Sequence, residues 1–555
     1  MLPWAIPSSV VLWLIFGLFR ELRRRRQKRA IIHFEDLPED VLQLVVAQLA
    51  RRHLEHLAGL SRTLRRKLSP VLFRAVRWAP LRRSFPPETL WPYVQRLTLA
   101  GDYPVSAHTL LSPTELDRGN IIEQLSAALP HLSALQTFTI SALVKGSLWP
   151  ELLEALAAHP TPRHLIMEAA WDEHSVILPE TRTSLEVFEY SGSMALYATG
   201  YNRRSSRDFE VEATNLRRIL SGCYSTLKAT SLPGELCLRA MDTSLDWATL
   251  QELHLEGFWP YALAPRASSE ARSSSSESAE ETASVELVRS PVLGLIEALP
   301  NLEHLRLLMS VVSDDAPGLT MLVGPHQHTP RNPETFLRRL RIIELASHLA
   351  NDRFLAFLPS TLDVLTLARY PLATQGNMSR PILAAPDLLE SLHGVDFPTL
   401  RSLTVWYRVR SLEQADADDE IFSLIPAKFP LLETLWIWRF WDHKVTEMED
   451  LWDPVPKCRR MLSRLPQLRH FRLNPATPER HGRPAFNNMD VTYRTHVKRL
   501  ERMAEEIVRD HPSLRHIALY RPYQNNVLFH WEHWEVQRSD EDEVRLKPID
   551  YQVDF

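Results

Sequence analysis

Two pairs of histidines have the spacing of metal ligands on one face of a helix. They occur in the strings HLEH (53–56) and HWEH (530–533), and side chains three residues apart lie close together on a helix. Neither pair has a further acidic or cysteine side chain at ligand spacing, so we interpret both as ordinary surface histidines. The sequence also lacks HExxH, GxSxG and nucleophilic-cysteine motifs. We therefore expect no catalytic residues, no metal and no cofactor.

Composition excludes several other classes of function. Glycine is scarce, at 16 of 555 residues, and neither GxGxxG nor GxxxxGK[ST] occurs, so a phosphate-binding loop is not expected. Lys+Arg (64) and Asp+Glu (68) nearly cancel to a net charge of −4, which argues against nucleic acid as a partner. Cys223, Cys237 and Cys458 are too few for a disulfide framework or a CxxC zinc site. We expect them to be small core residues in a reducing compartment.

Most of the chain carries a degenerate repeat, in which Leu, Phe or His precedes Pro and then x-L-x-x-L-x-L. Segments of helical period often precede the string, proline ends each helix, and the alternating tail is typical of a short strand. Stacked units of helix, proline stop and strand would bury the leucines. The clear copies are LPNLEHLRL (299–307), FPTLRSLTV (397–405), FPLLETLWI (429–437), LPQLRHFRL (465–473) and HPSLRHIAL (511–519).

Before the repeats, residues 31–78 have the pattern of a short helical module. Leu-Pro-Glu at 37–39 is a sound helix start, and aliphatic residues then recur at helical spacing in three successive segments. Three helices of this length bury little surface by themselves, so we expect part of their apolar surface to meet a partner.

This module resembles the F-box. The matching elements are Leu37-Pro38-Glu39, the spaced aliphatic residues, Leu60-Ser61-Arg62, and the closing Pro70-Val71-Leu72-Phe73. The charged stretch 50–53 departs from the family pattern. The resemblance implies docking on a Skp-type linker protein, and through it on a cullin. The alternative is a three-helix cap without a partner. By resemblance, the docking face comprises Leu37, Pro38, Val41, Leu44, Val45 and Leu60.

The remainder resembles the leucine-rich-repeat arrays found behind fungal F-boxes. We therefore predict an α/β fold in which the three-helix module precedes an irregular leucine-rich-repeat solenoid over 91–523, followed by a tail over 524–555. The copies start at 299, 397, 429, 465 and 511, so they are 98, 32, 36 and 46 residues apart, against 20–29 in the regular pattern. The asparagine that normally follows the strand leucines is missing from these copies.

Two segments interrupt the predicted array. Residues 266–284 are polar and serine-rich, which indicates a disordered insert; it is a plain linker or a site of serine phosphorylation. Residues 411–420, SLEQADADDE, are interpreted as an acidic loop.

In an L-x-L strand the leucines face the core and the x residues face the opposite, concave side. Among the x residues that this rule assigns to the concave side are His304, Thr404, His516 and Ala518. Exposed tryptophan is unfavourable unless something covers it, so either a protein substrate or the chain's own loops and tail lie over this side. The substrate-binding candidates are Arg306, Trp406, Trp436, Trp438, His470, Arg472 and Tyr520.

The amino-terminal 19 residues have the pattern of an uncleaved membrane anchor. Residues 2–19 carry no charge, and the basic flank over 20–30 follows them. A cleaved signal peptide would carry its charges before the apolar run, and the positive-inside rule places the rest of the chain in the cytosol. The endoplasmic reticulum and the outer mitochondrial membrane fit equally. A signal peptide and an amphipathic surface helix are the alternatives.

Together these patterns favour a non-catalytic substrate-recognition adaptor of an SCF-type (cullin-RING) ubiquitin ligase, anchored to a membrane. The module would bind the linker and the array would bind a protein substrate. The alternative is a membrane-anchored repeat scaffold with no ligase role. An enzyme with a novel site is the weakest hypothesis.

Overall fold

The computed structural model describes residues 37–101, 115–172, 174–191, 209–260, 290–310, 321–324, 329–346, 348–368, 382–441, 452–475, 491–521, 530–539 and 543–549. The predicted anchor (1–19), basic flank (20–30) and polar insert (266–284) lie outside them. Within the described part of the chain, no helix has the length and apolar character needed to cross a membrane. The chain divides into two compact units, Met1–Val144 with Ala158–Arg163, and Lys145–Ala157 with His164–Phe555.

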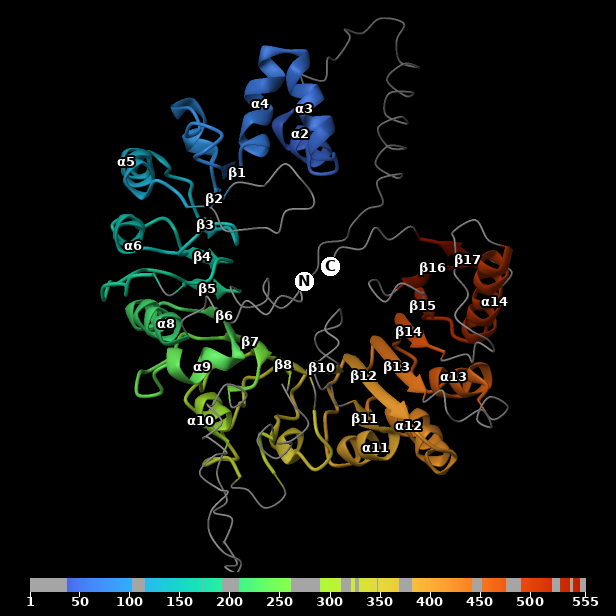
Figure 1. Ribbon diagram of the computed structural model, residues 1–555. Helices are drawn as coiled ribbons and strands as arrows, with labels where there is room; N and C mark the ends of the chain where they lie inside the picture. The colour runs from blue at the N-terminus through green and yellow to red at the C-terminus, as the bar shows by residue number, and fades with distance from the viewer. Residues whose placement is uncertain are drawn as a thin grey trace, which may run out of the picture. The chain divides into compact units, whose positions relative to one another are not determined.

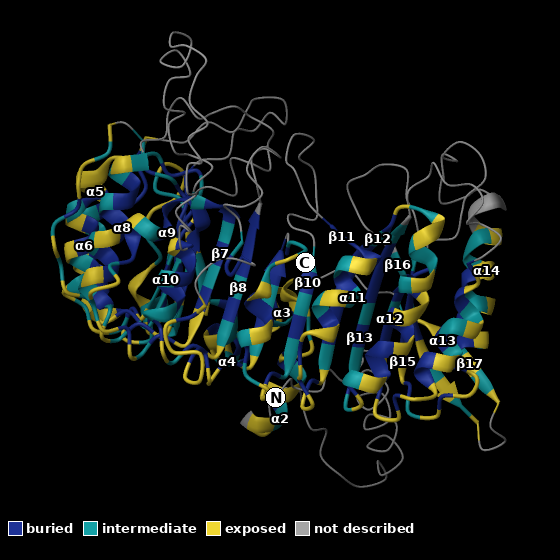
Figure 2. Ribbon diagram, turned by 90° about the horizontal axis from the view of Figure 1, so that it is seen from below, coloured by how far each residue is buried: buried dark blue, intermediate teal, exposed yellow. Residues whose placement is uncertain are grey.

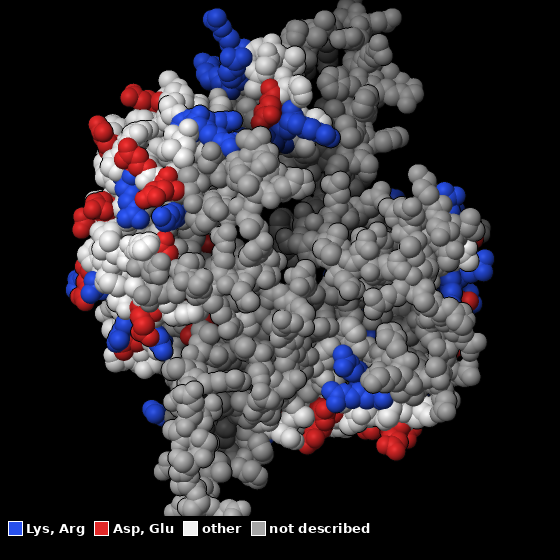
Figure 3. Space-filling model, in the orientation of Figure 1, with Lys and Arg blue, Asp and Glu red and all other residues white. Residues whose placement is uncertain are grey.

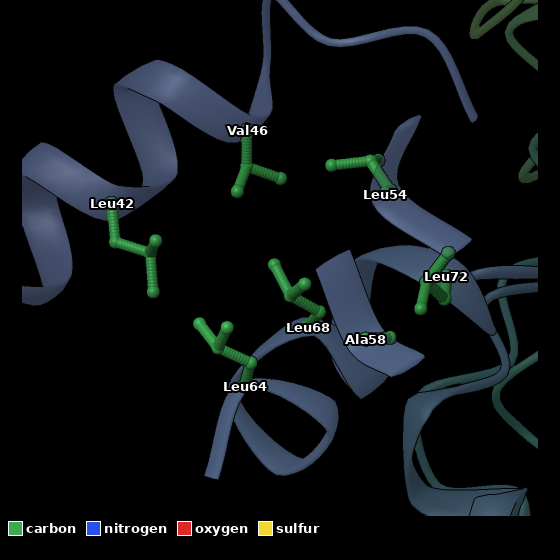
Figure 4. Packing of buried hydrophobic residues seen from close by; sticks show 7 residues of the cluster. All are labelled: Leu42, Val46, Leu54, Ala58, Leu64, Leu68 and Leu72. Atoms are coloured by element: carbon green, nitrogen blue, oxygen red, sulfur yellow. The ribbon is translucent and has the colours of Figure 1, made fainter. Parts of the chain in front are cut away.

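The first unit begins with three helices, α2 (Glu39–Val46), α3 (Arg51–Leu60) and α4 (Arg62–Leu72). Ser61 begins α4, and its Oγ accepts the backbone N–H of Leu64 at 3.0 Å, which satisfies one of the free donors of the first turn. The three helices share one apolar core, whose side chains point toward one another in Figure 4. The core residues are Leu42, Val46, Leu54, Ala58, Leu64, Leu68 and Leu72.

A short parallel sheet follows in the same unit. Strands β1 and β2 pair in parallel, as do β2 and β3. Proline at the second position of η3 ends the preceding helix α5, as the repeat pattern predicts. The elements are β1 (Ala75–Trp78), η2 (Glu88–Tyr93), β2 (Arg96–Leu99), α5 (Arg118–Ala128), η3 (Leu129–His131) and β3 (Thr137–Ile140).

The second unit is built from repeating strand and helix units. Its first half consists of α6 (Pro150–Ala157), β4 (His164–Met167), β5 (Val187–Tyr190), α8 (Phe209–Cys223), β6 (Ala229–Pro233), α9 (Gly234–Ala240), β7 (Glu252–Phe258), α10 (Pro291–Glu297), β8 (His304–Ser310) and β9 (Ile342–Ala346).

Its second half continues the same alternation until the last two strands. The elements are η8 (Arg353–Phe357), β10 (Val364–Ala368), β11 (Leu383–Ala384), α11 (Ala385–His393), β12 (Ser402–Val409), η9 (Leu412–Gln414), α12 (Ala415–Lys428), β13 (Thr434–Trp441), α13 (Pro454–Leu462), β14 (His470–Asn474), α14 (Val491–Val508), β15 (His516–Arg521), β16 (His530–Arg538) and β17 (Val544–Pro548).

Within this unit, the strands from β4 to β15 pair in parallel, and β16 and β17 continue the sheet in antiparallel fashion. The helices lie along one face of the sheet (Figure 1). Exposed residues lie on these helices, whereas the strands are mostly buried or intermediate (Figure 2). The prediction of an α/β fold with repeating leucine-rich units is confirmed for the described residues.

The leucines of each L-x-L string pack between sheet and helices, as predicted. One register row joins Leu253 of β7, Leu305 of β8 and the equivalent residues of β9, β10, β12, β13 and β14 to Ile517 of β15. Leu253, Leu305 and Ile517 have no exposed surface. Because side chains alternate along a strand, this buried row fixes which residues lie on the face without helices. We call that side the helix-free face.

A ladder of backbone hydrogen bonds joins neighbouring repeats just before their strands. The N–H groups of Arg341, Asp363, Arg401 and Glu433 each donate to the carbonyl of the equivalent residue one repeat earlier, at 2.8 to 2.9 Å. The side chains alternate in charge, and Arg341 pairs with Asp363 at 2.5 Å and Arg401 with Glu433. Backbone hydrogen bonds and ion pairs thus join the repeats along this edge of the sheet.

Residues 411–420 are not the acidic loop that the sequence predicts. Helix α12 starts at Ala415, and Asp416 and Asp418 lie in its first turn, where negative charge is favourable because of the helix dipole. Asp418 is also buried and paired with Arg439, a partner on a different element that the local sequence does not reveal.

All the parallel strands of the second unit end at the same edge of the sheet. Several undescribed segments begin directly after, or within three residues of, a strand end at this edge. They follow β5, β7, β8, β10, β13, β14 and β15. The irregular repeat spacing therefore reflects extra chain length added after strands, within an otherwise regular register.

Candidate protein-interaction surface

The helix-free face carries the predicted substrate-binding residues on three neighbouring register rows, one of which pairs Trp406 with Trp438. One row runs from Arg306 through Glu344, Thr366 and Thr404 to Trp436 and then to Arg472. A second row joins His304 to His470 and His516. The rule that assigns the x residues to this face is confirmed as a matter of placement.

The structure separates Arg306 from the other candidates. Four strand spacings lie between β8 and β13, which corresponds to about 19 Å across the sheet. The other six candidates, Trp406, Trp436, Trp438, His470, Arg472 and Tyr520, lie on the neighbouring strands β12 to β15.

Trp406, Trp436, Trp438 and Tyr520 form an aromatic cluster with Phe440 and Trp531. Trp406 and Trp438 face each other across β12 and β13 with ring centroids 4.0 Å apart. The cluster extends over β15 and β16, because the ring centroid of Trp438 lies 5.2 Å from that of Tyr520 and 5.3 Å from that of Trp531. Aromatic pairs contribute about 0.5–1.5 kcal/mol beyond the area they bury, so this cluster stabilises the end of the sheet.

The chain's own tail covers part of this cluster. Trp531 of β16 packs edge-on against Trp436 at 5.5 Å and against Trp438. Trp438 is 1% exposed and Trp406 4% exposed, whereas Trp436 is half-buried. Of the two alternatives that the sequence leaves open, coverage by the chain itself accounts for Trp438, and Trp436 retains accessible surface.

Polar side chains border the accessible part of the cluster. The guanidinium of Arg472 lies 5.1 Å from the ring centre of Trp436, a favourable cation–π geometry. The indole N–H groups of Trp406 and Trp436 are buried, and neither has a hydrogen-bond partner within the part of the chain that the structure describes. Tryptophan and arginine are the residue types that most often dominate protein interfaces.

Three histidines continue the helix-free face beyond Arg472. Nδ1 of His533 lies 3.4 Å from Nε2 of His516, and the ring of His470 lies 5.9 Å from that of His516. Burial, with the neighbouring His533 and Arg472, lowers the pKa of His516 to about 3. Burial and Arg472 lower the pKa of His533 to about 4. Both side chains are therefore neutral at pH 7.

A second polar group lies around Arg306. Its Nε donates to Glu344 Oε2 at 3.1 Å, and Nε2 of His304 lies 3.7 Å from Glu344 Oε1. His254 stacks edge-on against His304 with centroids 4.7 Å apart. Burial, followed by the charges of His304 and Arg306, lowers the pKa of His254 to about 4.

The sequence analysis missed several members of this face. Trp531 is inside the HWEH string, and β16 is a strand, so the helix-face spacing of that histidine pair does not apply. Glu252 and His254 lie in ATLQELHLEG (248–257), a string that resembles the repeat but lacks its proline. Phe440 continues the alternation of β13 past the end of the repeat string.

The residues expected to bind a linker lie in and around α2 and α3. Leu44 is 71% exposed and Leu60 is 74% exposed. Leu37, Val41 and Val45 are half-buried, and Pro38 is exposed. The same module carries basic side chains on α3 and α4, and Figure 3 shows Lys and Arg gathered on it. They are Arg51, Arg52, Arg62, Arg65, Arg66 and Lys67.

On the helix side of the second unit, a cavity of about 840 Å³ lies between α8, α9 and the segment 180–182. Three of its lining arginines are engaged: Arg217 pairs with Asp242 at 2.6 Å, Arg239 pairs with Glu210, and Arg218 donates to the carbonyl of Leu178. The three cysteines are buried and free, and burial raises the pKa of Cys223 and Cys237 to about 12, so they behave as core residues.

Comparisons with known proteins give little further information. No family model matches the sequence, and no curated protein matches it. Among solved structures, a chain from the crystal structure of the Rad7 and Elc1 complex in yeast aligns over 95% of this chain and 96% of that chain, with 11% sequence identity and a TM-score of 0.32. The fold class follows from the parallel register and the burial pattern of this chain itself.

Proposed function

We propose that this chain is the substrate-recognition adaptor of an SCF-type cullin-RING ubiquitin ligase. The three-helix module would bind a Skp-type linker protein, and the helix-free face would bind a protein substrate. The chain itself would perform no covalent chemistry. It would raise the concentration of substrate lysines near a ubiquitin-loaded enzyme by holding both partners.

The observation that carries this proposal is that α2 has apolar residues on two opposite sides. Successive residues on a helix are about 100° apart, so Leu44 lies opposite Leu42 and Val46, two positions from each. Leu42 and Val46 fill the core of the module, while Leu44 is 71% exposed. A second apolar side beyond what the core needs is typical of a helix that packs on another protein.

Leu60 at the end of α3 supports the same interpretation. It is 74% exposed although the preceding Ala58 and Leu54 are in the core. Leu44 and Leu60 are therefore two exposed leucines that the core of the module does not use. The surrounding arginines favour a partner whose contact surface has an acidic rim, since interfaces match opposite potentials.

The test is binding of recombinant Skp-type linker to the full-length chain in detergent. We expect Leu44→Asp combined with Leu60→Asp to weaken binding by about 30-fold or more, because a charge placed in an apolar contact costs at least as much as losing an interface hot spot. Both positions are exposed, so the fold is expected to tolerate the change. The control is Leu81→Asp, since Leu81 is 57% exposed but lies outside the module.

Two outcomes would contradict the proposal. One is that the wild type does not bind the linker, and the other is that the double variant binds it as well as the wild type does. The second candidate function would then stand, a leucine-rich-repeat scaffold that uses the three helices as a cap. The observation that favours that candidate is the shared apolar core of the three helices, because a cap needs only this packing.

We further propose that residues 1–19 anchor the chain in the endoplasmic reticulum or outer mitochondrial membrane with the folded part facing the cytosol. The support is the uncharged segment followed by a basic flank. Deletion of residues 1–19 should release the protein from carbonate-washed membranes. Retention of the deleted form on the membrane would contradict the anchor.

A further inference from the structure

A group of three potential metal ligands lies on the helix-free face of β7 and β8. We propose that Glu252, His254 and His304 form a binding site for a divalent transition metal, with zinc as the best match. The inference is independent of the ligase proposal.

The strand register places all three residues together. Glu252 lies directly opposite His304 across the parallel pair, and His254 follows Glu252 by two residues, which keeps it on the same face. One ligand atom from each residue lies within 4.8 Å of the others. Zinc binds nitrogen and oxygen ligands at about 2.0–2.2 Å, so a metal ion between these three atoms would draw them closer together.

The two imidazoles have buried ring nitrogens without a hydrogen bond among the described residues. Nε2 of His254 and Nε2 of His304 are both buried, and neither makes a hydrogen bond to any residue that the structure describes. A buried polar atom without a partner is unfavourable, and coordination of a metal would satisfy both nitrogens. Glu252 is exposed, so the group is reached from solvent.

The surrounding charges are compatible with a cation. Arg306 lies opposite His254 across the two strands, and its Nε is 3.1 Å from Glu344 Oε2, which offsets its positive charge. Glu344 also lies 3.7 Å from Nε2 of His304. It is therefore placed to orient that ring or to join the ligands, as carboxylates around metal-bound histidines commonly do.

The ligand types indicate the class of metal. Two imidazoles and one carboxylate suit zinc better than calcium or magnesium, which prefer oxygen ligands. Three protein ligands leave at least one coordination position for water or for a side chain of a bound protein. The site lies on the same face as the aromatic cluster but several strands away.

The test is titration of the full-length chain with zinc by calorimetry, and with cobalt by absorption spectroscopy. We expect one tight site that is lost in the double variant His254→Ala/His304→Ala. Replacing one ligand with Glu252→Gln, at an exposed position, should weaken the site by about 100-fold or more. The matched control is His53→Ala/His56→Ala, which also removes two histidines, both exposed.

Circular dichroism of each variant checks the fold, and Glu252→Gln remains decisive if the double histidine variant does not fold. Zinc should also raise the melting temperature of the wild type and of the control. The increase for Glu252→Gln should be much smaller. Equal stoichiometry and affinity in the wild type and in Glu252→Gln would overturn the site.

Discussion

His516 is a buried histidine near Arg472, and this makes the folded protein sensitive to acid. Its pKa is lowered from 6.5 to about 3 in the folded chain, whereas the unfolded chain takes up a proton near pH 6.5. Below pH 6.5 the unfolded state therefore binds more protons. The free energy of unfolding must fall as the pH decreases from 6.5 toward 3.

We predict that His516 lowers the free energy of unfolding of the wild type by about 2–4 kcal/mol when the pH is reduced from 7 to 4. His516→Gln should remove this part of the acid sensitivity. Urea unfolding at a series of pH values measures the difference between variant and wild type. The comparison variant is His131→Gln, outside the second unit. Parallel pH profiles for His516→Gln and the wild type would contradict the buried, neutral state of this ring.

Part of the helix-free face could be predicted residue by residue from the sequence. The alternation rule correctly placed Trp406, Trp436 and Trp438 on the helix-free face. It could not show that Trp531 returns to cover them, because that contact depends on a strand that runs in the opposite direction.

Among the elements, α12 is held to the sheet by a buried ionic group. The carboxylate of Asp418 accepts the Nε of Arg439 at 2.9 Å and the hydroxyl of Tyr407 at 2.7 Å. Trp452 lies against the guanidinium at 3.9 Å. Burial, followed by the charge of Asp418, raises the pKa of Tyr407 well above its ordinary value, so its hydroxyl remains a donor.

We predict that Arg439→Met destabilises the protein by about 3–5 kcal/mol, because it leaves the carboxylate of Asp418 buried without its cation. Asp418→Asn added to Arg439→Met should recover part of the loss, since no charge is then buried. Guanidinium unfolding curves of the two variants measure this. A double variant no more stable than the single one would show that the charge is not the cause.

The repeat elements were predictable because proline stops and leucine spacing are local signals. Helix α12 was not, since its acidic start resembles a loop until Arg439 is known to lie beside it. The long inserts hid the regular register, because sequence spacing counts inserted residues together with the repeat.

The whole second unit is an open sheet, and its carboxy-terminal end is closed by the hairpin of β16 and β17. This hairpin pairs with β15 in antiparallel fashion and supplies Trp531 to the aromatic cluster. An uncovered edge strand promotes association with other chains.

We therefore predict that a chain ending at residue 523 self-associates and binds a hydrophobic dye. Sedimentation velocity and dye fluorescence measure these two effects. Trp531→Ala should increase dye binding without self-association, because it uncovers the aromatic rings and keeps the paired strand. A truncated chain that remains monomeric would contradict an edge-protecting role of the hairpin.

The common direction of the parallel strands has a consequence for how such a chain can diversify. Each segment that follows a strand leaves the sheet from one edge, and its length changes neither the buried row nor the backbone ladder at the opposite edge. Insertions and deletions there are thus decoupled from folding. Related chains can be expected to share the framework while differing widely at this rim, and a peptide epitope inserted after β7 or β10 should be displayed without loss of the fold.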